Sequence, residues 1–491
     1  MISEVFKNLI ARLGAVHFNW RSFQQHRPRP YLRFLTNQRK MKLLLLIHTC
    51  FAMGMANRVY IHPFELLNAG DLGCEATDSK DKQPLDTIHS VTAIQASTEP
   101  DPRPATEELK NLTRWTAEVA ELQNSVGLRM YDALSSKQRD VNILLSPYTA
   151  FGTLVSLYLG TSKSTANDYE EFLGLIWNTE KSVCKKIITG HKVLRALKAI
   201  SSLSDGPQDE FRTLVWTFVS SDADLSKDFA HGIQEFSDTS FIRAVNFSQP
   251  KEAETQVNLF IQKTSHSKVE NLFKDITQST NLLFASAAHF KGNWRTAFQP
   301  EKTTVQDFWI DEKSTVKVPL MTHTSDYMHL SDDNKKCTVV KLGLSKQTYM
   351  LLVLPNEGTG LQDIENKLKT DTISKWHIHL KEKYLELSLP KFSMTAVTDL
   401  RSLFSDMSVE KFLLGSNTNF QRLSTKGNFM VDKVINKVLF EMSEEGIDVL
   451  NKSQDERVPL RVTMDRPFLF IIVEGNTNAI LMLGRIQNPT L

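Results

Sequence analysis

Cysteine pairs and the motifs of common enzyme classes are missing from this chain. Only four cysteines occur in 491 residues, and no two form a C-x-x-C pair. There is no G-x-S-x-G or H-E-x-x-H motif, and the lone Gly358-Thr359-Gly360 is typical of a turn. We interpret the 13 histidines as surface or core residues. The sequence therefore predicts no enzymatic activity, no catalytic residues, no metal site and no cofactor.

Long hydrophobic runs are also absent. No segment approaches the roughly 20 apolar residues that a membrane-spanning helix requires. The most apolar stretch, in "RKMKLLLLIHTCFAMGMA", follows basic residues and ends in small ones, as secretory signals do. We expect residues 41–56 to be a signal peptide that is cleaved after Ala56. The mature product is then soluble, secreted and extracellular.

A large charge excess is lacking over most of the chain. The formal net charge is +2, but residues 1–40 hold eight Lys or Arg against the single Glu4, so residues 41–491 carry −5. The basic excess therefore gives no reason to expect nucleic acid as a partner. Residues 1–40 have the composition of a mitochondrial transit peptide. A start at Met41 with an upstream extension is the interpretation we favour, because it restores an ordinary signal-peptide length.

Regular structure is expected only after residue 107. Residues 57–107 are rich in Asp, Thr, Ser, Pro and Gln, which predicts a flexible tail. From Glu108 apolar residues recur three and four apart, which predicts one amphipathic helix. These positions are Leu109, Leu112, Trp115, Val119, Leu122, Val126 and Met130.

The remaining sequence, residues 108–491, predicts an α+β fold. A short buried strand at 141–145 is followed by Ser146 as N-cap and Pro147 as first residue of a nearly all-apolar helix. "YLELSLPKF" places three leucines on one face of a strand. "PFLFIIVEGNTNAILMLGRI" predicts two buried strands around a turn from Glu474 to Asn478. Helices come first and strands dominate later, as in α+β domains.

Six blocks of this region, in order, resemble the serpin family. They are "NILLSPYTAFGTLVSLYLG", "LLFASAAHFKGNWRTAFQPEKT", "FWIDEKSTVKVPLM", "MLLVLPNEG", "LELSLPKFSM" and "RPFLFIIVEGNTNAILMLGRIQNPT". The resemblance implies one compact domain of three β-sheets with eight or nine helices. It also implies an exposed reactive loop shortly before the C-terminus.

The first residues after the predicted signal cleavage, "NRVYIHPFELL", resemble a vasoactive peptide hormone that a non-inhibitory branch of serpins carries. The match is unbroken from Arg58 to Phe64, while Asn57 and Glu65 replace the more familiar Asp and His. An exposed strand is the alternative, but no flanking segment supplies a partner and Pro63 would end it. The hormone residues are Asn57, Arg58, Val59, Tyr60, Ile61, His62, Pro63, Phe64, Glu65 and Leu66.

The resemblance also implies how the peptide is released. A renin-type aspartic protease cuts between Leu66 and Leu67, and a dipeptidyl carboxypeptidase then trims the product to end at Phe64. The trimmed peptide binds a receptor as a vasoconstrictor in blood-pressure and fluid regulation. Pro63 restricts the peptide backbone before docking, and Arg58 offers an always-charged planar group to an acidic receptor site. Glu65 puts the efficiency of trimming in doubt, because a carboxylate stands in place of imidazole.

An inhibitory serpin and a small-ligand carrier are the competing functions. Inhibitory members carry small residues after the hinge, here Glu444-Glu445-Gly446, whereas this chain continues with "IDVLNKSQDER". Insertion of the loop into a sheet would turn Val449, Asn451 and Ser453 inward. An unpaired buried amide costs about 1–3 kcal/mol, and a glycan could not enter at all. We therefore expect no inhibition; the sequence neither names nor excludes a carrier pocket.

Glycosylation sites and one disulfide complete the predictions. The sequons begin at Asn111, Asn246 and Asn451. Cys50 leaves with the signal, so the mature chain can form at most one internal bridge among its three cysteines. Three buried free thiols remain the alternative. By resemblance to the hormone-carrying serpins, whose tail is tethered to the body, Cys74 pairs with Cys184.

Overall fold

The computed structural model describes residues 106–175, 183–204, 210–237, 239–344, 348–424, 429–448 and 457–491. These residues form ten α-helices, none long and apolar enough to cross a membrane, and fourteen strands. The helices are α4 (Thr106–Lys137), α5 (Pro147–Gly160), α6 (Lys163–Leu173), α7 (Val183–Ser204), α8 (Lys227–Phe236), α9 (Pro250–Thr264), α10 (Leu361–Glu365), α11 (Thr370–His379), α12 (Leu400–Asp406) and α13 (Glu410–Leu413). The strands are β1 (Ile143–Leu145), β2 (Glu210–Ser220), β3 (Thr239–Val245), β4 (Leu282–Thr296), β5 (Thr304–Trp309), β6 (Thr315–Asp332), β7 (Cys337–Gly343), β8 (Thr348–Pro355), β9 (Lys381–Pro390), β10 (Met394–Asp399), β11 (Lys433–Asp448), β12 (Leu460–Thr463), β13 (Phe468–Glu474) and β14 (Ile480–Ile486).

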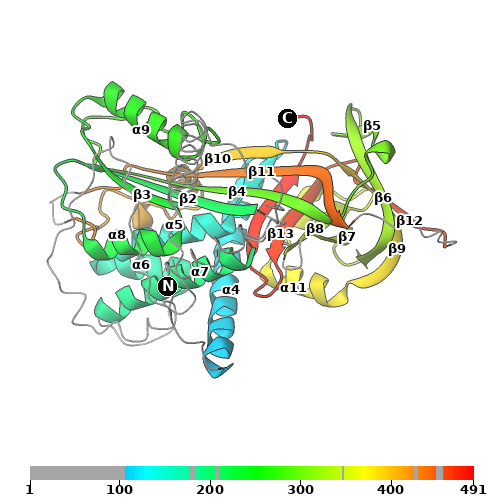
Figure 1. Cartoon of the computed structure of the whole chain (residues 1–491), viewed down its shortest axis with the longest axis horizontal. Coiled ribbons are helices and arrows are strands. Elements are labelled where there is room, and N and C mark those ends of the chain that lie inside the picture. The colour runs from blue at the N-terminus through cyan, green and yellow to red at the C-terminus, as the bar shows by residue number, and fades with distance from the viewer. Residues whose placement is uncertain are drawn as a thin grey trace, which may run out of the picture. The chain divides into compact units, whose positions relative to one another are not determined.

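A five-stranded sheet separates two hydrophobic cores. Its order is β10-β11-β4-β2-β3, and β11 and β4 are parallel neighbours although they are far apart in the sequence. Figure 1 shows α9 on one side of this sheet and α5 to α8 on the other. Along β4, Ala285 and Ala287 belong to the core under α9, whereas Phe284 and Ala288 belong to the larger core. Both faces of β4 are thus buried, as the alternation of side chains along a strand requires.

A nine-stranded sheet contains the remaining strands. Its order is β1-β14-β13-β8-β7-β6-β9-β12, with β5 against β6. The long strand β6 pairs with β9 over residues 320–329 and with β7 only over 328–332. Two of the three sheets that the resemblance implied are therefore joined by hydrogen bonds through β6. The described helices number ten rather than eight or nine because α10 and α13 are short turns of five and four residues.

The helix predicted after Ser146 is confirmed as the centre of the larger core. The Ser146 hydroxyl accepts a hydrogen bond from Thr149 N at 3.3 Å, and Pro147 is the first residue of α5. All fourteen residues of α5 are buried, because the helix contacts α4, α7, α8 and strands of both sheets. The apolar composition of this segment follows from that position.

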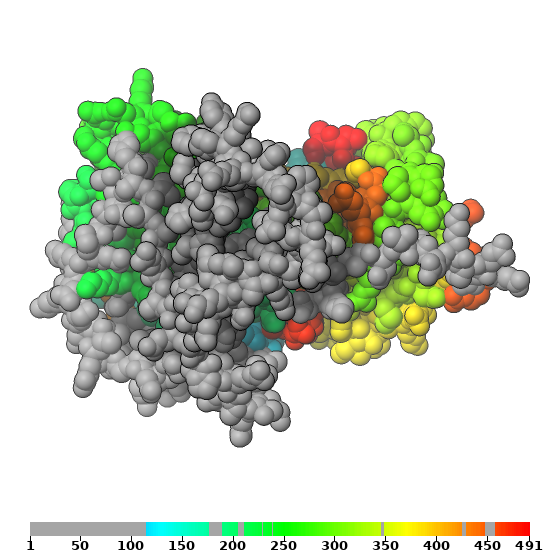
Figure 2. Space-filling model, in the orientation of Figure 1, coloured from blue at the N-terminus to red at the C-terminus, as the bar shows by residue number. Residues whose placement is uncertain are grey.

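The predicted strands near the C-terminus are also confirmed. Leu385, Leu387 and Leu389 of β9 are fully buried, and β13 pairs with β14 in antiparallel register. Their connecting turn is held by the buried carboxylate of Glu474, which accepts hydrogen bonds from Thr477 N and Asn476 N at 2.8 and 2.9 Å. The C-terminal residues, red in Figure 2, reach the surface beside the yellow-green β5 region.

A buried ion pair ties the C-terminal strand to the helical layer. The guanidinium Nη1 of Arg485, on β14, lies 2.9 Å from Glu365 Oε2 of α10. The hydroxyl of Tyr131, on α4, donates to Glu365 Oε1 at 2.6 Å. Burial raises the pKa of Glu365, and the Tyr131 hydrogen bond and the Arg485 charge offset part of this effect. A carboxylate this deep needs both partners to stay charged.

Replacing Arg485 with methionine is expected to lower the free energy of unfolding by about 3–5 kcal/mol, because the Glu365 carboxylate loses its counter-charge. Arg461→Met is the control, since the Arg461 side chain is 81% exposed and lies 3.0 Å from Glu386. That change should cost about 1 kcal/mol or less. Urea unfolding of both variants measures the difference, and equal losses would contradict the assignment.

Candidate functional site

The structure describes few of the predicted site residues. Asn111 lies in α4 and Cys184 in the first turn of α7, where only the backbone is described. Asn246 is exposed between β3 and α9, and its Oδ1 accepts from Ser248 N at 3.0 Å. The predicted residues outside the described part are Ala56, the peptide Asn57–Leu66, Leu67, Cys74 and Asn451. Among the described residues, the predicted functional region with defined contacts is β11, the strand that leads into the predicted reactive loop.

The strand β11 pairs with β4 in two stretches separated by a bulge. Met442 lies opposite Gly292 and Gly446 lies opposite Trp294, so four steps along β11 match two along β4. Pairing then continues to Asp448. Extra residues in one strand bend it and leave local backbone groups without a ladder partner. This bulge contains the first residues of the predicted hinge.

Three contacts fix the bulge. The indole Nε1 of Trp294 donates to Ser443 O at 2.8 Å, and the backbone N of Phe298 donates to Glu444 O at 3.0 Å. The Lys391 ammonium lies 2.6 Å from the Glu444 carboxylate. This hydrogen bond from Lys391 lowers the pKa of Glu444, which therefore stays charged near neutral pH. The start of the hinge is held by side chains from two other parts of the chain.

The two ends of the loop are both anchored to the body. A Cβ at Gly446 would lie only 2.3 Å from Ala297 N, so no larger residue fits this close backbone contact. At the far end, Arg457 makes two hydrogen bonds to the Asp326 carboxylate at 2.9 and 2.8 Å. The Arg457 guanidinium also lies over the Tyr384 ring, 4.3 Å from its centroid.

A buried polar network joins β4, β11 and α5 at the middle of the sheet. The amide Nδ2 of Asn436, on β11, lies 2.9 Å from Ser286 Oγ of β4 and 2.9 Å from Thr149 Oγ1 of α5. The Thr153 hydroxyl donates to Ser286 Oγ at 2.8 Å. All four residues are fully buried. Each hydrogen bond is strengthened by its apolar surroundings, and separating β4 from β11 would break the one between Asn436 and Ser286.

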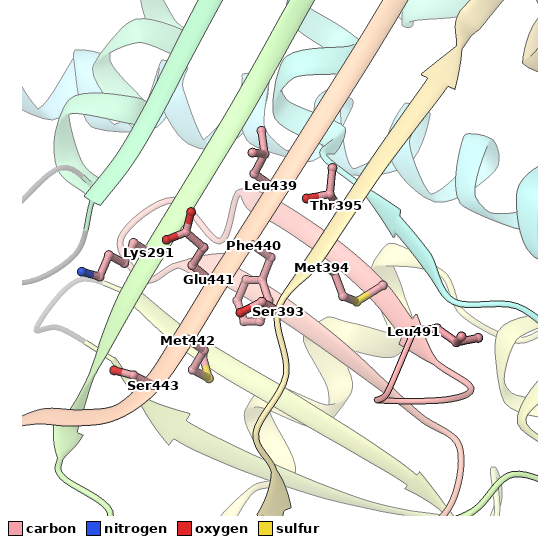
Figure 3. A pocket seen from close by; sticks show the side chains of 10 residues that line it. All are labelled: Lys291, Ser393, Met394, Thr395, Leu439, Phe440, Glu441, Met442, Ser443 and Leu491. Atoms are coloured by element: carbon pink, nitrogen blue, oxygen red, sulfur yellow. The ribbon is translucent and has the colours of Figure 1, made fainter. Parts of the chain in front are cut away.

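An open cavity of about 680 Å³ lies where β10 begins, beside the bulge (Figure 3). Its floor is apolar, whereas Lys291, Ser393 and Thr395 on its rim are exposed. In the part of the chain that the structure describes, no three His, Cys, Asp or Glu side chains are grouped to hold a metal. The cavity is lined by Lys291, Ser393, Met394, Thr395, Leu439, Phe440, Glu441, Met442, Ser443 and Leu491.

Comparison with known proteins assigns this architecture. The family model described as "Serpin (serine protease inhibitor)" matches residues 121–489. The chain belongs to the serpin family. Mouse protein Z-dependent protease inhibitor superposes with a TM-score of 0.69 at 25% identity, covering 77% of this chain and 99% of that one. Human thyroxine-binding globulin, in complex with thyroxine, gives 0.67 at 26% identity, covering 76% and 99%. The predicted α+β serpin fold is confirmed.

The serpin is similar to angiotensinogens beyond the serpin domain itself. It is 29% identical to rat angiotensinogen and 27% identical to human angiotensinogen, in each case over 91% of this chain and 97% of the relative. Bovine serpin A3-1 is 28% identical but matches only 76% of this chain. The hormone-carrying serpins that the sequence resembles are the angiotensinogens. The predicted resemblance of this chain to them is confirmed.

Sequence reasoning did not single out Asn436 or the contacts of the bulge. A signal for Asn436 was present, because it is a polar residue in register with the inward-facing Val434, Val438 and Phe440. The anchoring role of Trp294 has no comparable signal. Its partner is set by pairing between strands that are distant in the sequence.

Among the described side chains, Cys337 is a free cysteine, and the predicted disulfide between Cys74 and Cys184 leaves it unpaired. Cys337 is fully buried in β7, and burial, with a smaller contribution from Asp332, raises its pKa to about 12. We expect iodoacetamide to leave Cys337 unmodified in the folded protein at about pH 8 and to alkylate it after unfolding, because the thiolate is the reactive form. Peptide mass mapping of both samples measures this. Rapid alkylation of the folded chain would contradict the burial of this thiol.

Proposed function

We propose that this serpin is a secreted precursor of an angiotensin peptide. A renin-type aspartic protease cuts between Leu66 and Leu67 and releases Asn57–Leu66. A dipeptidyl carboxypeptidase then removes Glu65 and Leu66, and the product ending at Phe64 acts on an angiotensin receptor as a vasoconstrictor. Blood-pressure and fluid regulation is the process served. The proposal rests on the unbroken match from Arg58 to Phe64.

The extent of the similarity to angiotensinogens supports this proposal. A match over 91% of 491 residues leaves about 44 residues unmatched, so the matched span includes residues 57–67. The serpin family model begins only at residue 121. The peptide segment thus lies within the span over which this chain is similar to those relatives.

The position of the peptide also supports release without unfolding. The first described element, α4, begins at Thr106, which is 40 residues beyond Leu66. A protease binds its substrate as an extended strand, and the composition of residues 57–107 predicts a flexible tail that can take that form. Secretion agrees with the exposed sequon at Asn246, and we propose glycosylation there and at Asn111 and Asn451.

Digestion with a renin-type protease is expected to give a first product that ends at Leu66. The folded body provides the internal control, because its other Leu-Leu bonds are inaccessible. Mass spectrometry of products with time measures this, and a first cut within the body would contradict it. These control bonds, between residues that are at most 1% exposed, are Leu144-Leu145, Leu282-Leu283, Leu351-Leu352 and Leu413-Leu414.

The body is proposed not to inhibit proteases. Insertion of a cleaved loop between β4 and β11 would require the hinge residues to enter the sheet, and those after Gly446 are large or polar. The contact of Lys391 with Glu444 and that of Trp294 with Ser443 hold the start of the hinge in place. A glycan on Asn451 would add a group that no sheet interior can accept.

Cleavage of the loop between Gly446 and Val462 is expected to produce no rise in melting temperature. The reason is that strand insertion, which stabilises a cleaved inhibitory serpin, is opposed by the hinge residues. An Asn451→Gln variant removes the glycan and separates its effect from that of the hinge, and we expect no rise there either. Calorimetry before and after nicking measures this. A large increase in either protein would overturn the proposal.

A disulfide between Cys74 and Cys184 is proposed to tether the peptide to α7. Leu66 lies eight residues before Cys74, so the cut bond would stay within roughly 26 Å of Cys184. The bridge would close a loop of 110 positions, from Cys74 to Cys184. Closing a loop of about this length contributes at most about 4.7 kcal/mol to the free energy of unfolding in the chain-entropy account. Cys74→Ser should change the rate of peptide release while the body stays folded. Non-reducing peptide mapping that finds Cys74 free, or joined to Cys337, defeats the assignment.

A further inference from the structure

The turn that follows α9 is strained. His266 and Ser267 have φ angles of 52° and 61°, in the left-handed region that residues other than glycine rarely adopt. Just beyond them, Val269 is 1% exposed and its backbone N donates to Ser265 Oγ at 3.0 Å. Two consecutive residues in this conformation persist only where surrounding contacts hold them.

Lys268 connects this turn to the sheet. Its Nζ lies 3.0 Å from Glu441 Oε1 on β11 and 3.1 Å from His289 Nε2 on β4. The Glu441 and His289 atoms are themselves 3.0 Å apart. Three polar atoms from three elements therefore lie at mutual hydrogen-bond distance. They lie on the sheet face that α9 covers, next to Leu439 in the core under α9.

These three contacts cannot all be hydrogen bonds in one protonation state. When Nε2 of His289 carries no proton, it accepts from Lys268, which also donates to Glu441. When Nε2 is protonated on a charged imidazolium, it donates to Glu441 and repels the ammonium. His289 is 3% exposed, whereas Lys268 and Glu441 are each 42% exposed. Lys268 is therefore the group that can leave for water.

We propose that protonation of His289 displaces Lys268 from the sheet and frees the strained turn 265–269 at the end of α9. Because α9 covers the face where β4 and β11 meet, acid would loosen the cover over this pair of strands. The inference concerns the serpin body alone and does not depend on the proposed hormone function.

The charge state of Glu441 agrees with this exchange of partners. Burial raises the pKa of Glu441, but the hydrogen bond from Lys268 and the neighbouring His289 outweigh it and hold the pKa below its usual range. Glu441 thus stays charged in mildly acid solution and can accept a hydrogen bond from a protonated imidazole. Other charged groups on this sheet face and turn include Arg212 on β2, Arg243 on β3, Lys291 on β4, Lys433 and Lys437 on β11, and Glu270 in the turn.

Hydrogen exchange of the full-length protein tests the proposal. After correction for intrinsic rates, we expect amides 265–270 to exchange about threefold or more faster at about pH 5.5 than at about pH 7.5. His289→Gln should remove this difference and keep exchange slow, because glutamine can accept from Lys268 but takes up no proton. Lys268→Met should give fast exchange at both pH values.

His266→Gln is the matched control, since His266 lies in the same turn and is exposed. It should keep the pH response of the unmodified chain. A response that persists in His289→Gln, or no response in the unmodified protein, overturns the proposal. If His289→Gln does not fold, Lys268→Met decides alone: persistence of the pH response in that variant overturns the proposal, and its loss supports it.

Discussion

The parallel contact between β4 and β11 is the constraint on which the rest of this serpin depends. The two strands come from distant parts of the chain and bring both of their faces into cores. Both faces need a cover, which explains why α9 lies on one side and the fully buried α5 on the other (Figure 1). One buried hydrogen bond, from Asn436 of β11 to Ser286 of β4, links the two strands at the middle of this contact and opposes their sliding.

The polar contacts around this strand pair fall into zones of different exposure. In the middle, Asn436 and its partners are fully buried. Towards the loop, Lys391 and Glu444 are partly exposed, and the same is true of Lys268 and Glu441 near the end of α9. Partly exposed ion pairs contribute little to stability, but they can exchange partners with water or with a neighbouring proton acceptor. The buried hydrogen bonds in the middle of the sheet therefore hold β4 and β11 together. The partly exposed ion pairs towards the loop are the contacts that a change of pH or salt concentration can alter.

The proposed hormone function makes few demands on this architecture. The proposed peptide precedes α4, the first described element, by 40 residues of sequence. The body in turn needs no inserting loop, and the large and polar residues after Gly446 agree with that. The span that is similar to angiotensinogens begins well before residue 121, where the serpin family match starts.

The sequence by itself determined the features that depend on neighbouring residues. The cap at Ser146, the apolar run of α5, the three inward leucines of β9 and the final strand pair could all be predicted, because local periodicity and capping decide them. The peptide match and the order of the serpin blocks are properties of the sequence as well. Only the tertiary structure decided the joining of two sheets through β6, the bulge before Gly446, and the meeting of Lys268, His289 and Glu441. These depend on which distant strands become neighbours and in what register, and no local pattern in the chain carries that information.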